Sequence, residues 1–182
     1  MFSIVLLTII YFYKINFQQS KKLLNKFIYV IMKKLILEYQ NKWASGIVEI
    51  GKTKNNFKES VSVTTKFINE LYDFENGNVQ FKPTKASEKQ FRNDFESALS
   101  YFIGNNTDFS EDSGFALNPW VSVEFENDSL NVYDDIGIAM GNYFFTDQNG
   151  DQTKVEYSFV YKKVGDSLKI ILHHSSLPYQ TK

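Results

Sequence analysis

The sequence predicts an α+β fold in which N-terminal helices pack on one side of a curved antiparallel sheet. Apolar residues recur at helical spacing through residues 35–102, whereas strand-like segments separated by turn residues follow from Trp120 onward. Helices that are segregated from an antiparallel sheet along the chain make an α+β domain. The aromatic share of 16% suits a sheet-rich core. The length of 182 residues fits a single domain at residues 32–182, with residues 1–31 as an N-terminal extension.

Residues 1–31 differ from the rest of the chain in composition. Residues 2–13 form an apolar run that is too short to span a bilayer as a straight helix. The run lacks the basic region and the small-residue cleavage site of a signal peptide. Residues 21–34 mix Lys with Leu, Ile, Phe and Tyr, as a basic amphipathic helix does. Three interpretations stay open: a degenerate export leader, an interfacial membrane anchor, or an extension upstream of a start at Met32. The first two favour an exported, periplasmic or membrane-tethered protein, and the third a cytoplasmic one.

Three helices are predicted in the first part of the domain. Residues 35–50 and 57–74 both carry apolar side chains at helical spacing. A third helix is expected to begin with Ser87 as its N-cap, because Gln90 follows three residues later as in a capping box. Gly104 ends that helix.

Strands account for most of the remaining chain. A short strand at residues 79–82 is closed by Pro83 and lies between the second and third helices. The later strands are expected at residues 120–125, 130–133, 136–146, 154–164 and 168–176. Asn149-Gly150 is a hairpin signal between two of them. Such a meander wrapped around a long helix would enclose a cone-shaped cavity, which is a usual place for a ligand.

Composition excludes several kinds of chemistry. The chain has no cysteine and only two histidines, His173 and His174, which are adjacent. A disulfide framework, a thiolate nucleophile and a zinc site built from His and Cys are therefore excluded. A hard ion held by Asp and Glu stays open. The formal net charge of -1 provides no basic field for nucleic acid.

The last predicted strand contains the most chemically competent residues. Successive side chains of a strand point to opposite faces. Regular alternation would place His174 and Ser176 on one face with Ile170, and His173 and Ser175 on the other with Ile171. One imidazole and one hydroxyl would then face whatever the sheet encloses. The alternative interpretation is a frayed strand end with solvated side chains.

Six segments together resemble the iota-class carbonic anhydrases, in particular their bacterial single-domain branch. The resemblance covers residues 35–179 in the right order. The segments are Phe81-Lys-Pro-Thr-Lys-Ala86, Ala98-Leu-Ser-Tyr-Phe102, Gly114-Phe-Ala-Leu-Asn-Pro-Trp120, Ala139-Met-Gly-Asn-Tyr-Phe-Phe-Thr-Asp147, Lys154-Val-Glu-Tyr-Ser-Phe159 and His173-His-Ser-Ser-Leu-Pro-Tyr179.

This resemblance implies a cone-shaped fold like that of nuclear transport factor 2, similar to the association domain of calcium/calmodulin-dependent kinase II. It also implies reversible hydration of carbon dioxide to bicarbonate without a metal cofactor. Some relatives are described as manganese-dependent, so the resemblance leaves a carboxylate-bound manganese as the alternative. Sheet-to-sheet homodimers are usual among similar proteins.

The resemblance carries over a catalytic set of Thr, Tyr, His and Ser. Thr84 and Tyr101 match its segments, and His174 with Ser176 are chosen by face, with His173 and Ser175 held in reserve as substrate-binding residues. Asn142 and Tyr157 are expected to line the same cavity.

In this hypothesis His174 accepts or relays the proton, since an ordinary imidazole titrates near neutral pH. Thr84 and Tyr101 orient the water and donate to the forming bicarbonate, and Ser176 completes the network. Two other functions stay open, because a fold does not fix a function: a non-catalytic binding or oligomerisation module, and a hydratase or isomerase acting on a small organic substrate.

Overall fold

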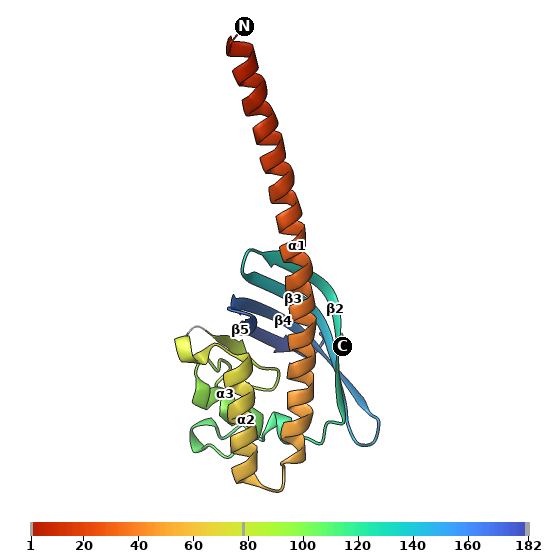
Figure 1. Ribbon diagram of the computed structural model, residues 1–182. Coiled ribbons are helices and arrows are strands. Elements are labelled where there is room, and N and C mark those ends of the chain that lie inside the picture. The colour runs from red at the N-terminus through yellow and green to blue at the C-terminus, as the bar shows by residue number, and fades with distance from the viewer. Residues whose placement is uncertain (1, 78, 181–182) are drawn as a thin grey trace.

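The computed structural model describes the backbone of residues 2–77 and 79–180, and the side chains of these residues from Phe17 onward. Within them the helices are α1 (Phe2–Lys52), α2 (Phe57–Leu71) and α3 (Phe95–Ile103), with short 3-10 turns η1 (Phe74–Asn76), η2 (Thr107–Phe109) and η3 (Phe115–Leu117). The strands are β1 (Gln80–Lys82), β2 (Ser122–Tyr133), β3 (Ile136–Thr146), β4 (Gln152–Val164) and β5 (Ser167–Ser176). Figure 1 shows the helices on one side of the sheet, with the N-terminal part of α1 projecting beyond the body.

The sheet is mixed, with the strand order β1-β5-β4-β3-β2. Strands β2 to β5 form the expected antiparallel meander. Strand β1 adds a parallel edge next to β5 and pairs Phe81 with His173. The predicted α+β class is therefore confirmed. The pairing of β1 with β5 could not be predicted, because a strand of three residues has no local pattern that specifies its partner. Its pairing decides where the following Thr84 lies.

Helix α1 supplies the central part of the core. The helix predicted at residues 35–50 is the C-terminal part of this longer helix, and its apolar side faces the sheet. Its buried side chains include Met32, Ile36, Tyr39, Trp43, Ile47 and Ile50. The indole of Trp43 lies at the centre, with ring centroids of Tyr143, Phe159 and His173 between 5.5 and 6.0 Å away. Burying such large aromatic surfaces is a major stabilising contribution.

The third helix begins later than the sequence predicts. Asp94, not Ser87, is the N-cap of α3: its carboxylate accepts from the Ser97 backbone N–H at 2.8 Å. Ser97 Oγ completes the capping box by accepting from the Asp94 N–H at 3.4 Å. Ser87 instead donates its N–H to the Glu111 carboxylate at 2.7 Å. A carboxylate from a distant loop thus competes successfully for the N–H groups that a helix start would have used.

The second long-range difference is in β2. Instead of the separate strands predicted at residues 120–125 and 130–133, there is one continuous strand with a β-bulge between Asn127 and Ser129, where the polar Asn127-Asp128 pair is typical of a turn. Gly141 lies opposite the bulge, and a Cβ there would sit 2.1 Å from the Glu126 carbonyl oxygen. The glycine allows this close approach of two backbones, so the pairing continues where the sequence signals a turn.

Candidate active site

The final strand presents His173 and Ser175 to the interior, each 2% exposed. His174 is exposed and Ser176 partly exposed on the outer face, so the orientation expected for His174 and Ser176 is wrong. The reason is a bulge in β5: consecutive residues Val160 and Tyr161 pair with Leu172 and Ile170, which leaves Ile171 as an extra residue. An extra residue shifts the alternation, so Ile170 and His173 face the same side.

The His173 ring is enclosed by aromatic side chains. It stacks on Phe81 with centroids 4.6 Å apart and meets Phe159 edge-on at 4.2 Å. Its Nδ1 lies 2.9 Å from the Tyr72 hydroxyl, which accepts from Trp43 Nε1 at 2.9 Å. Because an indole N–H only donates, the Tyr72 hydrogen is free to point at Nδ1. This arrangement favours the tautomer with the ring proton on Nε2, which lies 3.4 Å from the Tyr143 hydroxyl.

Burial lowers the pKa of His173 well below its ordinary value of 6.5, and the neighbouring His174 adds to the effect. The imidazole is therefore neutral at pH 7. A neutral imidazole can order its neighbours through hydrogen bonds, but one with a strongly lowered pKa is a poor store for a proton.

Hydroxyl groups from three strand segments meet beside this ring. Thr84, which lies just beyond β1, donates from Oγ1 to Ser175 Oγ at 2.9 Å. Tyr143 comes from β3. Burial raises the pKa of Tyr143, and hydrogen bonds with Ser175 and Thr84 oppose that rise. The hydrogen-bonded pairs Thr84–Ser175 and Tyr143–His173 therefore lie side by side, and these four residues are here called the hydroxyl cluster. Thr84 is its partly exposed member.

Tyr101 reaches the same region from α3. Its ring stacks on Phe115 with centroids 5.4 Å apart and meets Phe81 edge-on. Burial raises the pKa of Tyr101, while a hydrogen bond with the Lys85 backbone opposes the rise. The Tyr101 hydroxyl thus lies near the backbone of Lys85, the residue that follows Thr84.

A buried ion-pair network holds the loops beside Tyr101. Arg92 Nη2 lies 2.8 Å from Asp112 and 3.2 Å from Glu111. Ser100, adjacent to Tyr101 on α3, donates to Asp112 at 2.6 Å. Hydrogen bonds from the backbones of Glu88, Ser87 and Lys89 lower the pKa of Glu111 to about 2. These contacts tie the segment after Thr84 to α3.

The polar groups of the two remaining predicted residues, Asn142 and Tyr157, are not part of the hydroxyl cluster. Tyr157 is buried on the inner face, and its ring lies 5.3 Å from that of Tyr143. Its hydroxyl is engaged elsewhere, because it donates to Asn127 at 2.8 Å and accepts from Gln40 at 3.1 Å. Asn142 lines a groove together with His174 and Ser176, and Tyr157 lines it as well, so these four predicted residues do share one hollow.

Among the residues that hydrogen-bond around His173, Tyr143, Tyr72 and Trp43 were not predicted as part of the site. Strand alternation could have placed Tyr143 inside, because it is two residues from the buried Phe145. No local signal distinguishes Tyr72 or Trp43 from ordinary core aromatics.

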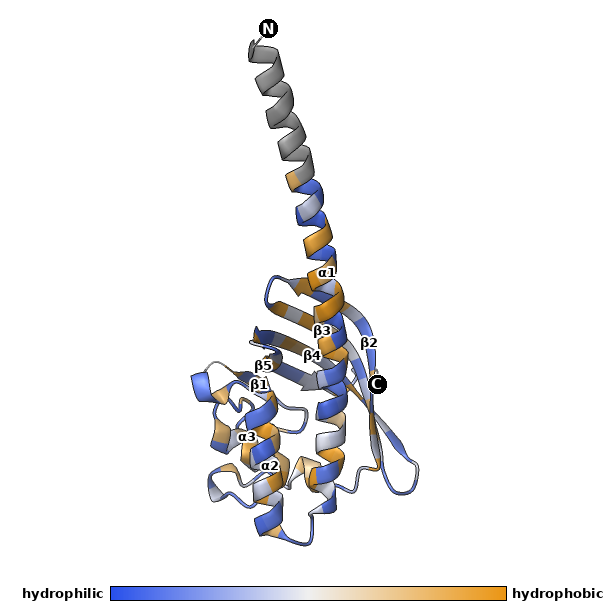
Figure 2. Ribbon diagram, in the orientation of Figure 1, coloured by the Kyte–Doolittle hydropathy of each residue, from blue (hydrophilic) through white to orange (hydrophobic). Residues whose placement is uncertain are grey.

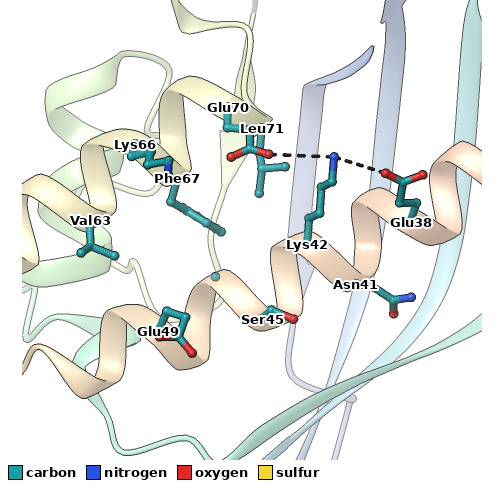
Figure 3. A pocket seen from close by; sticks show the side chains of 11 residues that line it. Glu38, Asn41, Lys42, Ser45, Glu49, Val63, Lys66, Phe67, Glu70 and Leu71 are labelled. Atoms are coloured by element: carbon teal, nitrogen blue, oxygen red, sulfur yellow. Dashed lines mark ion pairs between the residues drawn. The ribbon is translucent and has the colours of Figure 1, made fainter. Parts of the chain in front are cut away.

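Other features of the described residues do not contribute to this chemistry. No group of three or more His, Cys, Asp or Glu is placed to hold a metal ion within them. A groove of about 620 Å³ lies between α1 and α2. Figure 3 shows Lys42 in this groove, paired with Glu38 at 3.3 Å and Glu70 at 3.9 Å. None of the predicted catalytic residues lines it.

The helix-covered, curved sheet defines the class of the fold. An NTF-2-like protein of unknown function from Shewanella oneidensis MR-1 superposes with a TM-score of 0.50 at 13% identity, covering 79% of this chain and 98% of that one. A Xanthomonas campestris protein assigned as a calcium/calmodulin-dependent protein kinase II association domain gives a TM-score of 0.54 at 20% identity, covering 80% and 87%. These likenesses show an NTF2-like fold.

Closer relatives define the family. Residues 34–177 match the family described as metal-independent carbonic anhydrase. A metal-independent carbonic anhydrase from Nostoc sp. (strain PCC 7120) is 36% identical over 149 residues, covering 80% of this chain and 73% of the relative. The crystal structure of a cyanobacterial iota-carbonic anhydrase complexed with bicarbonate superposes with a TM-score of 0.79 at 35% identity, covering 81% and 93%. The chain belongs to the metal-independent carbonic anhydrase family, which confirms the resemblance found in the sequence.

Proposed function

We propose that this protein catalyses the reversible hydration of carbon dioxide to bicarbonate without a metal ion. The observation that carries the proposal is the hydroxyl cluster, which joins Thr84, Ser175 and Tyr143 to the neutral imidazole of His173. The cluster lies within the segment that matches the family. The bicarbonate bound by the cyanobacterial relative supports the same substrate here.

The reaction requires a nucleophilic water and a place for negative charge. The water oxygen forms a bond to carbon while one carbon–oxygen π bond gives its electron pair to oxygen, and the water loses a proton. Thr84 and Ser175 hold the water, and their hydroxyls pass its proton to solvent at the partly exposed Thr84. Tyr143 donates to the oxygen on which charge develops. Fixed donors of this kind stabilise an oxyanion without reorganising during the reaction.

His173 and Tyr101 act through their neighbours. The Trp43–Tyr72 pair fixes the His173 ring, whose Nε2 faces the Tyr143 oxygen. His173 is thus a positioning residue that orients the Tyr143 hydroxyl, because its lowered pKa makes it unsuited to storing the proton. Tyr101 positions the backbone that carries Thr84 through Lys85.

A stopped-flow assay with a pH indicator, run in excess chelator, tests this proposal. The unaltered protein should hydrate carbon dioxide, and Thr84→Ala or Ser175→Ala should each lose on the order of 10²–10³ in kcat. His174→Ala and Ser176→Ala are the matched controls from the outer face and should keep activity within about twofold.

Two results would overturn it. If activity appeared only with added manganese, the metal-free mechanism would be wrong. If no hydration occurred with or without manganese, a binding module would explain the fold better.

We further propose that the outer face of the sheet binds a second copy of the chain. Ile138, Val160 and Leu172 pair in register across β3, β4 and β5, and they alternate with buried residues, so they form an apolar row on that face. Met140 beside this row is 50% exposed. Light scattering should report a dimer that Val160→Lys converts to a monomer, whereas Lys162→Gln leaves it intact. A monomeric unaltered protein would contradict this.

A further inference from the structure

The N-terminal part of α1 has a net positive charge, whereas the rest of the chain has a net negative charge. Residues 1–37 contain six lysines and no Asp or Glu, whereas residues 38–182 contain 14 basic and 21 acidic residues. Figure 1 shows this part of the helix projecting away from the body. The chain is therefore strongly polarised, with a basic helix at one end of an acidic domain.

Apolar side chains are exposed on a side of this helix that does not pack on the sheet. Leu23, Phe27, Val30 and Leu37, here called the outer stripe, are spaced at four, three and seven residues, which places them on one side of a helix. Leu23 and Phe27 are 69% and 64% exposed. The side that packs on the sheet is a different one, marked by the buried Met32, Ile36 and Trp43. In Figure 2, apolar and hydrophilic positions alternate along the coloured portion of the projecting helix.

Lysines flank the outer stripe. Lys22, Lys26 and Lys33 are spaced at four and seven residues and form a row beside it, and Lys34 lies about one turn from both Val30 and Leu37, on the same side as the stripe. An apolar stripe bordered by lysines is the pattern of a helix that lies in the plane of a membrane interface. The methylene groups of a lysine side chain can lie in the apolar layer while its ammonium group reaches the lipid headgroups.

Acidic side chains of the body lie beside one flank of this helix. Asp134, Asp135 and Asp166, at the tips of two hairpins, line a groove with that flank, and Phe27, Lys34 and Lys163 line it as well. The row of Lys22, Lys26 and Lys33 does not line this groove, so an anionic surface is attracted most strongly to that row. Within the part of the chain that the structure describes, no helix is long and apolar enough to cross a membrane.

We propose that residues 17–37 of α1 bind the surface of an anionic lipid bilayer, with the outer stripe in the interface and the lysines on the headgroups. A second copy is a poorer occupant, because these residues carry no acidic side chain to pair with the lysines of another helix. Binding would tether the catalytic domain at a membrane surface. This inference goes beyond the proposed catalytic function.

The test is co-sedimentation of the full chain with vesicles of phosphatidylcholine, with and without phosphatidylglycerol. Binding should require phosphatidylglycerol and weaken as salt is added. The combined Lys22→Gln, Lys26→Gln and Lys33→Gln variant should bind on the order of a hundredfold more weakly, at about 1 kcal/mol for each lysine. Leu23→Ser combined with Phe27→Ser should also reduce binding strongly.

Matched controls come from the body of the protein. Phe91, which is 65% exposed on a loop, provides Phe91→Ser as an apolar control, and Lys162→Gln with Lys163→Gln provides a charge control. Both should bind vesicles like the unaltered chain. Carbon dioxide hydration by each soluble variant should be unchanged, which separates this proposal from the catalytic one.

Three outcomes would overturn the proposal. The first is equal binding to vesicles with and without phosphatidylglycerol. The second is vesicle binding that is unchanged in both the stripe variant and the lysine variant, which would assign vesicle binding to residues 1–16. The third is an oligomer in solution that these variants abolish in the absence of vesicle binding, which would assign the stripe to a second copy.

Discussion

His173 and His174 are adjacent in sequence but have opposite environments. His173 is enclosed by aromatic rings and bonded to Tyr72, whereas His174 is exposed on the outer face. The chemistry of the two imidazoles therefore differs because of the side of the sheet, not because of the residue type. Their contrast provides a matched pair for experiments.

The stability of the protein should depend on pH through His173. Its pKa in the folded protein lies below the unfolded value of 6.5, so the unfolded chain binds the proton more readily. The stabilising contribution of the neutral ring is complete above pH 6.5 and is lost as the pH falls from there toward the folded value. Urea unfolding between pH 7.5 and 5.5 should show a free energy of unfolding that falls by up to about 1.4 kcal/mol per pH unit.

The His174→Gln variant is the control for this measurement and should keep the same slope. A slope that disappeared in His174→Gln would show that the exposed histidine is responsible, contrary to the burial of His173.

Tyr143→Phe should lower kcat for carbon dioxide hydration by about 10²-fold while leaving the core packed, because it removes one donor and no ring. Tyr157→Phe removes a hydroxyl from the neighbouring ring that is engaged with Gln40 and Asn127. It should leave kcat nearly unchanged. Equal losses in the two variants would show that both hydroxyls act only through folding.

Strand β5 is the element whose irregularity decides the site. At its bulge, Ile171 is an extra residue of β5 that has no paired residue on β4. The alternation of inward and outward side chains is therefore shifted by one residue after the bulge. Leu168 and Ile170 face the core before it, and His173 and Ser175 face the core after it.

Deleting Ile171 should leave a regular ladder, because Ile170 and Leu172 already pair with consecutive residues of β4. We expect the deletion variant to fold with His173 still inside and to remain sensitive to His173→Ala but not to His174→Ala. Circular dichroism and the hydration assay would check this. Activity that came to depend on His174 would contradict the assigned register.

Helix α3 offers a second test at this scale. Asp94→Ala removes the N-cap and should lower the free energy of unfolding by about 1 kcal/mol. Ser87→Ala should cost less, because Glu111 keeps the backbone N–H groups of residues 87–89. Chemical denaturation of both variants compares them, and a larger cost for Ser87→Ala would support a helix start at residue 87.

At the scale of the whole molecule, the site is assembled from segments that are far apart in the chain. Helix α1 supplies Trp43, β1 leads to Thr84, β3 supplies Tyr143 and β5 supplies His173 and Ser175. From Phe17 onward, where side chains are described, the projecting part of α1 contributes no residue to it, and Met32 is the first fully buried apolar side chain of that described part. Catalysis and the proposed membrane contact thus belong to different parts of the molecule.

Removing residues 1–27 should therefore preserve the fold and the hydration rate. We expect a melting temperature within a few degrees of that of the full chain, since the lost side chains from Phe17 to Phe27 are exposed. Calorimetry and the hydration assay measure both quantities. A large loss of activity would show that the extension contributes to the site.

The sequence by itself determined the fold class, the helices and strands with strong periodicity, and the exclusion of a cysteine-based site. It also pointed to Thr84, Tyr101 and the terminal His-Ser motif, because these residues lie in segments that resemble the family. Patterns of this kind are local, and they predict the structure correctly wherever no contact with a distant residue overrides the local preference.

Only the tertiary structure decided which histidine faces the cluster, where α3 begins and which strand pairs with β1. Each of these depends on a contact between distant residues: the β4–β5 register, the Glu111 carboxylate and the pairing of Phe81 with His173. Strand alternation has a period of two, so one extra residue at Ile171 is enough to exchange the buried and exposed members of a four-residue motif.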